Sequence, residues 1–225
     1  MFLEKVIMIT LTEENYIKAI FHLSLQGKET VSTNDLAEAM NTKASSATDM
    51  IKKLSEKGYA NYKKYQGVIL TDSGKKVALS IIRKHRLWEV FLVDKLGFTW
   101  DEVHEVAEQL EHIKSPKLIN QLDRFLDYPK HDPHGDPIPD INGNMPIVEK
   151  TLLSQAQVGH IYSCIGVNDS SAEFLQYLDT NNIQLGSEIE IMYIEPFDKS
   201  IKIKVNNNEF TVSNSVAKNL YLKKN

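Results

Sequence analysis

The fold is indicated most clearly by residues 32–70, which read STNDLAEAMNTKASSATDMIKKLSEKGYANYKKYQGVIL. The stretch begins with a short helical pattern and passes through a polar turn into a second one, from Ser45 to Lys57, for which Ser45 and Ser46 are suitable N-cap residues. Two short strand patterns follow, with lysines between them. Helix, turn, helix and basic hairpin in this order predict a winged helix-turn-helix over residues 1–72.

The second helix of such a motif lies in the major groove of DNA, so its polar residues are candidates for DNA contact. Residues at its N-terminal end would face base edges, and lysines farther along the helix and on the hairpin would neutralise phosphates. The candidates are Lys43, Ser45, Ser46 and Asp49 for the bases, and Lys52, Lys53, Lys63 and Lys64 for the phosphates. The alternative is a solvated module that only packs against the rest of the chain.

Charge and composition limit the partners and the compartment. The net charge is −4 and the pI is about 6.0, which excludes a uniformly basic nucleic-acid binder and requires a local cationic patch for DNA. The single cysteine, Cys164, has no internal partner for a disulfide. No stretch approaches the ~20 apolar residues of a membrane span, so we expect a cytoplasmic protein without a membrane partner.

Helical patterns continue after the hairpin. A long one, either continuous or with one bend or break, runs over Thr71–Leu96. The capping-box spacing of Thr99–Glu102 predicts a helix that continues to about Ile113. Ser115–Pro116 predicts the start of one more helix, because serine is a good N-cap and proline fits the first helical position. Residues 73–146 are therefore expected to form a helical domain that ends in a Pro-rich linker.

The remaining sequence changes in character. Residues 128–146 are rich in Pro, Gly, Asp and Asn and are predicted to form a loop. From about residue 150, segments such as Ile201–Val205 alternate between apolar and polar side chains, as strands do. A short helical pattern, Ser171–Thr180, interrupts them. These patterns predict a small β-barrel domain over residues 147–225.

Residues able to bind a metal recur at helical spacing. They are His104, Glu108, Glu111 and His112 on one predicted helix, and His85 and Glu89 on the preceding one. The first four stand at i, i+4, i+7 and i+8, which places them on one stripe of a helix, and the other two stand at i and i+4. Imidazole and carboxylate groups together suit first-row divalent metals. The alternative is a solvated helix face with local ion pairs, and His131 and His134 of the Pro-rich loop are expected to be solvated.

The chain resembles the family of the diphtheria toxin repressor and the manganese transport regulator (DtxR/MntR) over nearly its whole length. The resemblance is carried by residues 83–89, RKHRLWE, by residues 103–112, VHEVAEQLEH, and by residues 133–139, PHGDPIP. Residues 153–222 are similar to the SH3-like domain of ferrous-iron-transport A (FeoA) proteins. The implied fold is mainly α with a β wing: a winged helix-turn-helix, a helical dimerisation domain and a C-terminal SH3-like, FeoA-like β-barrel.

The resemblance also implies two metal sites in each protomer. The primary site matches Asn15, Glu108, Glu111 and His112, and the ancillary site matches His85, Glu89 and His104, with Glu173 as the nearest match for a ligand from the SH3-like domain. Position 108 is glutamate in the manganese branch and cysteine in the iron branch. A set of O and N ligands suits Mn(II) or Fe(II).

Two positions depart from the manganese branch, which commonly has acidic residues where this chain has Asn15 and Lys18. Because a protonated lysine cannot ligate, a two-manganese cluster is not expected. In the family the Pro-rich segment lies between domains, which makes His131 and His134 poor candidates for metal ligands.

The expected function is that of a metal-dependent transcriptional repressor, activated by Mn(II) or Fe(II), that controls metal-ion uptake. It would bind a palindromic operator in double-stranded DNA as a homodimer, and it would not be an enzyme. One alternative is a winged-helix regulator that senses an organic ligand, with the His and Glu residues in structural roles. The other is a metalloenzyme, for which the chain lacks a His-Glu-x-x-His motif.

Overall fold

The structure is a computed structural model that describes residues 9–25, 27, 30–146 and 148–225. Its contacts divide the chain into two compact units. Of these described residues, the first unit contains those up to His85 together with 110–114 and 139–144. The second contains those in 86–109, 115–138 and 145–225.

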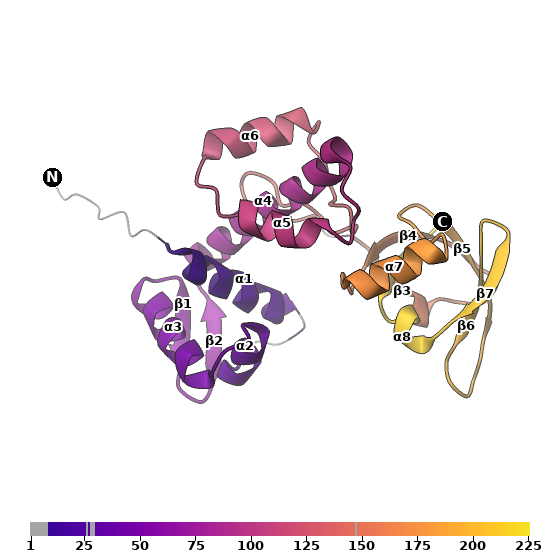
Figure 1. Ribbon diagram of the computed structural model, residues 1–225. Coiled ribbons are helices and arrows are strands. Elements are labelled where there is room, and N and C mark those ends of the chain that lie inside the picture. The colour runs from indigo at the N-terminus through magenta and orange to yellow at the C-terminus, as the bar shows by residue number, and fades with distance from the viewer. Residues whose placement is uncertain (1–8, 26, 28–29, 147) are drawn as a thin grey trace. The chain divides into compact units, whose positions relative to one another are not determined.

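Three helices and a hairpin form the winged helix-turn-helix of the first unit (Figure 1). They are α1 (Leu11–Leu25), α2 (Thr33–Ala39), α3 (Ala44–Glu56), β1 (Ala60–Lys63) and β2 (Gly67–Leu70). The strands are antiparallel, with Ala60 opposite Leu70 and Lys63 opposite Gly67. Fully buried aliphatic side chains such as Ile17, Leu36 and Ile51 form the core. The predicted winged helix-turn-helix fold is thus confirmed, while residues 1–8, 26, 28 and 29 of its predicted range lie outside the described part.

Local hydrogen bonds explain where these helices begin. The Thr10 hydroxyl accepts from the Glu13 amide at 3.3 Å while the Glu13 carboxylate accepts from the Thr10 amide at 2.9 Å, which is a reciprocal capping box. The prediction that Ser45 and Ser46 cap the next helix is wrong, because α3 already begins at Ala44. Lys43 is the extended residue before it and provides no side-chain cap, so both serines lie in the first turn.

Helix α4 (Asp72–Leu96) is one helix of 25 residues, so the long predicted helix is present and the alternative of a break does not occur. Helix α5 (Val103–Leu110) is shorter than predicted and stops three residues before Ile113. The Ser115 hydroxyl caps α6 (Pro116–Phe125) by accepting a hydrogen bond from the Leu118 amide. Helical geometry is disfavoured for a residue that precedes proline, so the preceding helix must end before Ser115. Glu111 and His112 therefore lie in a turn and not on a helix.

The C-terminal part of the second unit is a six-stranded antiparallel sheet with strand order β3-β8-β4-β5-β6-β7 (Figure 1). Its elements are β3 (Thr151–Leu152), the 3-10 helix η1 (Leu153–Gln155), β4 (Ile161–Val167), α7 (Ala172–Thr180), β5 (Glu188–Ile194), β6 (Ile201–Val205), β7 (Asn208–Val212), α8 (Asn214–Ala217) and β8 (Leu220–Lys224). Strand β6 buries Ile201, Ile203 and Val205 and leaves the lysines between them half-buried, as period-two patterning predicts.

The Pro-rich loop lies directly on strand β4. The His134 carbonyl accepts from the Val167 amide at 3.0 Å, and a Cβ at Gly135 would stand 2.0 Å from the carbonyl oxygen of Ile165. Gly135 also has φ +86°, in the region that favours glycine. The predicted loop is therefore packed against β4. Only glycine at position 135 permits this close contact with the Ile165 carbonyl oxygen.

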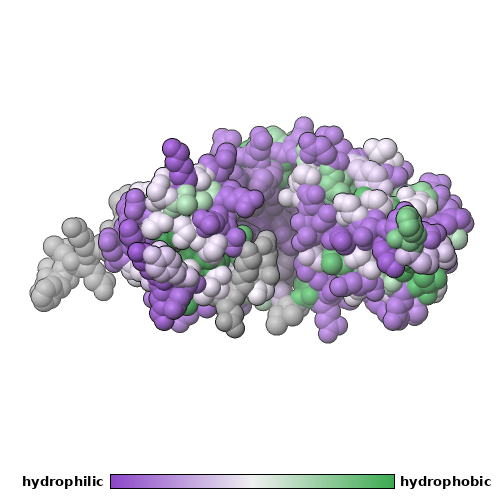
Figure 2. Space-filling model, turned by 90° about the horizontal axis from the view of Figure 1, so that it is seen from below, coloured by the Kyte–Doolittle hydropathy of each residue, from purple (hydrophilic) through white to green (hydrophobic). Residues whose placement is uncertain are grey.

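The surface visible in Figure 2 is mainly hydrophilic, and hydrophobic residues occupy small separate areas of it. Within the described ranges, no helix has the length and apolar character needed to cross a membrane.

Candidate metal centre

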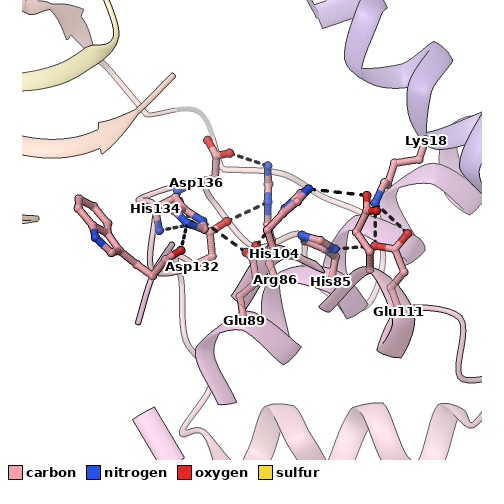
Figure 3. A network of polar contacts seen from close by, with 11 residues as sticks. Lys18, His85, Arg86, Glu89, His104, Glu111, Asp132, His134 and Asp136 are labelled. Carbon is pink, nitrogen blue, oxygen red and sulfur yellow. Dashed lines mark hydrogen bonds and ion pairs between the residues drawn. The ribbon is translucent and has the colours of Figure 1, made fainter. Parts of the chain in front are cut away.

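Glu111 is the centre of a buried polar cluster in the first unit (Figure 3). Both of its carboxylate oxygens lie 2.8 Å from the Lys18 ammonium on α1, and Oε2 lies 2.6 Å from His85 Nδ1 on α4. Burial would raise the pKa of Glu111, but the hydrogen bond with His85 and the Lys18 charge lower it overall. Glu111 is therefore a buried carboxylate anion held by cationic and imidazole partners.

His112 joins the same turn to α1. Its Nδ1 lies 2.6 Å from Glu14 Oε2, and Lys114 donates to the carbonyl oxygen of Ile9 at 2.6 Å. Glu14 was not predicted as a functional residue, since 98 positions separate it from His112 and no local pattern connects them. Two consecutive predicted ligands thus contact the first helix of the winged helix-turn-helix.

A second cluster has Glu89 at its centre. Glu89 is 2% exposed, and its Oε1 lies 3.6 Å from His104 Nδ1 on α5, while His104 Nε2 lies 3.7 Å from Glu108. His85 lies one helical turn before Glu89 on α4, and ligand atoms of His85, Glu89 and His104 fall within 4.8 Å of one another. The structure therefore brings together three residues of the predicted ancillary site.

His134 is buried beside Glu89, which corrects the expectation that it is solvated. It is 6% exposed, its Nδ1 lies 3.7 Å from Glu89 Oε2, and its Nε2 is 2.8 Å from the Trp100 carbonyl oxygen (Figure 3). The Trp100 ring stacks on the imidazole at 6.3 Å with an interplanar angle of 14°. Burial opposes protonation of His134, but Glu89, Asp132 and the Trp100 carbonyl raise its pKa to about 9.

Asp132 belongs to a second group of residues whose ligand atoms lie close together, with Glu89 and His134. Its Oδ1 accepts from the amides of His134 and Asp136 at 2.9 Å each, and its Oδ2 lies 3.3 Å from Arg86 Nε. Burial and the Glu89 charge raise its pKa. Because the loop backbone and Arg86 already use both oxygens, Asp132 mainly holds the Pro-rich loop in place.

The remaining predicted ligands lie apart from these contacts. Asn15 is half-buried on α1, and Glu173 is exposed in the first turn of α7. The two potential metal-binding groups of His, Cys, Asp or Glu side chains found among the described residues include neither Glu173 nor Glu108. Their roles stay predictions. The density of Asp, His and Pro in residues 131–137 was the signal that could have drawn attention to His134.

The predicted DNA-contacting residues are all exposed; they are Lys43, Ser45, Ser46, Asp49, Lys52, Lys53, Lys63 and Lys64. Three of them, Asp49, Lys52 and Lys53, already have ion-pair partners within the module. Lys52 lies 3.5 Å from Asp49, both largely exposed, and Lys53 lies 3.0 Å from the buried Glu13. Lys53 therefore has a structural role that the sequence did not indicate.

The fold and these clusters define a class of protein: a DNA-binding module whose first helix contacts a group of imidazoles and carboxylates. Comparison with protein families agrees with this class. Residues 8–68 match the iron-dependent repressor N-terminal DNA-binding domain, residues 71–140 match the iron-dependent repressor metal-binding and dimerisation domain, and residues 151–224 match the FeoA domain.

Individual relatives agree with these matches. The chain is 33% identical over 125 residues to the regulator MntR of Oceanobacillus iheyensis, covering 56% of this chain and 84% of that protein. It is 30% identical over 128 residues to the iron-dependent repressor IdeR of Mycobacterium tuberculosis, covering 57% and 55%. A solved manganese-dependent transcriptional repressor in complex with manganese has a TM-score of 0.86 at 33% identity, over 95% of this chain and all of that one.

The chain belongs to the DtxR/MntR family of metal-dependent, DNA-binding transcriptional repressors. The family consists of regulators and not of enzymes, so the metalloenzyme alternative is set aside. The predicted fold, with its winged helix-turn-helix, helical dimerisation domain and FeoA-like domain, is confirmed.

Proposed function

We propose that the chain represses metal-uptake genes from the cytoplasm when Mn(II) or Fe(II) is abundant, as a homodimer on a palindromic operator. The donor chemistry supports these metals. The clusters contain carboxylates and imidazoles, whereas Cys164 is buried in the core of the FeoA-like domain and burial raises the pKa of its thiol to about 11. Hard O and N ligands without a thiolate suit Mn(II) and Fe(II).

The primary site would use Asn15, Glu108, Glu111 and His112. The observation that carries this proposal is the pair of contacts by which Glu111 and His112 reach α1, at 2.8 Å to Lys18 and 2.6 Å to Glu14. A divalent ion bound here would be held by the side chains of Glu111 and His112. Asn15 lies on the same helix, so ligation would fix α1, and with it the recognition helix α3, to the turn that follows α5.

The ancillary site would use His85, Glu89 and His104, and we propose His134 as its fourth ligand in preference to Glu173. The His134 Nε2 faces the Trp100 carbonyl oxygen and can donate to it, so a metal beside Glu89 would bind Nδ1 and displace the proton that the raised pKa of His134 keeps there. Glu173 is exposed on α7. We also propose two metal sites in each protomer. The proposed domains are residues 1–72, 73–146 and 147–225.

The test is DNA binding as a function of metal. An operator would first be selected from a random duplex library with the full chain and Mn(II), and its affinity would then be measured by fluorescence anisotropy with Mn(II), with Fe(II) under anaerobic conditions, and with a chelator. We expect either metal to raise the affinity by roughly 5- to 150-fold, the usual range of allosteric coupling. Equal affinity with metal and with chelator would contradict the proposal and favour a regulator that senses an organic ligand.

Variants would locate the effect. Glu111→Gln and His112→Ala should abolish the metal-dependent increase, whereas Glu105→Gln, an exposed residue on α5, should retain it. Circular dichroism would show whether each variant is folded. A retained increase in Glu111→Gln would remove Glu111 from the primary site.

A further inference from the structure

The ammonium group of Lys18 contacts the carboxylate of Glu111, which the proposed primary site uses as a ligand. Its ammonium nitrogen lies 2.8 Å from both oxygens of Glu111, and the two side chains are 13% and 1% exposed (Figure 3). A hydrogen bond between an ammonium group and a carboxylate is charge-assisted and is roughly twice as strong as one between neutral groups. The contact joins α1 to the turn after α5, two segments that are 93 positions apart.

A buried carboxylate is strongly unfavourable unless a positive charge and hydrogen bonds compensate it. Glu111 receives the charge from Lys18 and an additional hydrogen bond from His85. The chain therefore carries its own cation in the place where a divalent ion would sit if it used Glu111 as a ligand. A metal that binds there must take at least one carboxylate oxygen from the ammonium group and must tolerate its charge nearby.

We propose that Lys18 is an internal cation that competes with the metal for Glu111 and so sets the metal concentration at which the primary site fills. The inference rests on the proposed function, in which Glu111 is a ligand of that site. In the metal-free protein the ammonium contacts both oxygens of Glu111 and joins this residue to α1. On metal binding, Lys18 is the group that gives way, because Glu111 is attached to the turn that also carries His112.

The proposal has two measurable consequences. Removal of the Lys18 charge should tighten metal binding at one site, on the order of tenfold, because the repulsion between the ammonium group and a nearby divalent ion is removed. It should also lower the thermal stability of the metal-free protein, because Glu111 loses its compensating charge, and Mn(II) should restore that stability. A purely structural lysine would lower the stability without tightening metal binding.

The experiment compares full-length wild type with Lys18→Met, Lys18→Gln and Lys18→Arg. Lys18→Gln keeps a hydrogen-bond donor and guards against loss of folding in Lys18→Met, and Lys18→Arg keeps the charge. Lys114→Met is the matched control, since Lys114 belongs to the same turn and contacts the Ile9 carbonyl oxygen instead of Glu111. Mn(II) affinity and stoichiometry would be measured by isothermal titration calorimetry, and melting temperatures with and without Mn(II).

We expect Lys18→Gln, and Lys18→Met where it folds, to bind Mn(II) about tenfold more tightly, since neither variant keeps the repelling charge. Lys18→Arg and Lys114→Met should stay close to wild type. Unchanged or weaker Mn(II) binding in Lys18→Gln would overturn the proposal. Glu111→Gln in the wild-type background distinguishes failure of the Lys18 proposal from failure of the proposed function. If Glu111→Gln retains every Mn(II) site, then Glu111 is not a ligand and the proposed primary site itself is wrong.

Discussion

Glu13 shows how one buried side chain can connect two helices of the winged helix-turn-helix. It is fully buried on α1, closes the capping box with Thr10, and pairs with Lys57 at 2.8 Å and Lys53 at 3.0 Å from α3. Burial would raise the pKa of Glu13, but the hydrogen bonds from Lys57, Thr10 and Lys53 outweigh it and lower the pKa to about 2. The ionised form is therefore the one that the folded module favours.

This depressed pKa predicts a specific pH dependence of stability. Because the pKa of Glu13 in the folded protein lies below its ordinary value of 4.5, the ionised carboxylate contributes stability above pH 4.5, and this contribution is lost as the pH falls toward 2. The difference corresponds to roughly 3 kcal/mol at neutral pH. Glu13→Gln should lose most of this amount at pH 7, and its difference from wild type should shrink as the pH falls.

Urea denaturation at several pH values would measure this, with the exposed Glu105→Gln as the control. A constant difference between Glu13→Gln and wild type from pH 7 to pH 3 would mean that Glu13 acts through packing alone.

At the scale of elements, the recognition helix and the wing differ in how freely their lysines can contact DNA. Lys53 on α3 is held by Glu13, whereas Lys63 and Lys64 lie exposed at the hairpin tip. Each phosphate contact that is removed should reduce the slope of log affinity against log salt by about one unit. Lys63→Ala should show this reduction on operator and on scrambled duplex alike, and Lys53→Ala should show less of it.

For Ser46 we expect a change that depends on the DNA sequence, unlike the change expected for the lysines. It lies in the first turn of α3, where a side chain can reach base edges. Ser46→Ala should change the preference among operator variants by roughly 1–3 kcal/mol if it makes a good base contact. Anisotropy titrations at several salt concentrations would measure both serine and lysine variants. Equal losses on operator and scrambled duplex for Ser46→Ala would show that this helix does not read bases directly.

The Pro-rich loop gives a steric prediction with an internal control. Gly135 and Gly159 have similar backbone angles, φ +86° and +80°, but a Cβ at Gly135 would meet the Ile165 carbonyl oxygen at 2.0 Å, whereas Gly159 has nothing within 4 Å. Alanine at either position should cost about 1 kcal/mol for the left-handed backbone. Gly135→Ala should lose about 1–3 kcal/mol more, because the added carbon overpacks the contact with β4.

Tryptophan fluorescence during urea denaturation would measure the difference, because Trp88 and Trp100 both belong to the second unit. Equal losses in the two alanine variants would indicate that the loop can separate from β4 at little cost.

The elements were predictable where their signals are local, and the site was predictable only in part. Ser115 and Pro116 mark the start of α6 within two residues, and the alternation of Ile201–Val205 marks β6. The contact of Lys18 with Glu111 and that of His134 with Glu89 depend on segments far apart in the chain, and no local pattern contains them. The end of α5 was missed because the helical pattern of His104 to His112 continues past the point where the turn toward Pro116 begins.

At the scale of the whole molecule, an acidic chain has to bind an acidic polymer. With a net charge of −4, long-range electrostatics oppose DNA binding, and the lysines of α3 and the wing act against that background. Metal adds positive charge to the protein and, through the contacts of Glu111 and His112 with α1, would also order the DNA-binding module. These two effects have different signatures, since a charge effect weakens with salt and an ordering effect does not.

Thermodynamic linkage provides the test that joins the scales. If metal raises operator affinity through sites in this chain, then operator DNA must raise metal affinity by the same factor. We expect one factor, within roughly 5- to 150-fold, from operator titrations with and without Mn(II) and from Mn(II) titrations with and without operator. An ordering mechanism predicts that the factor changes little between low and high salt, although DNA affinity itself falls steeply. If metal strengthens DNA binding while DNA leaves metal affinity unchanged, then the metal acts on the DNA or on aggregation, and Glu111 and His112 do not couple the two.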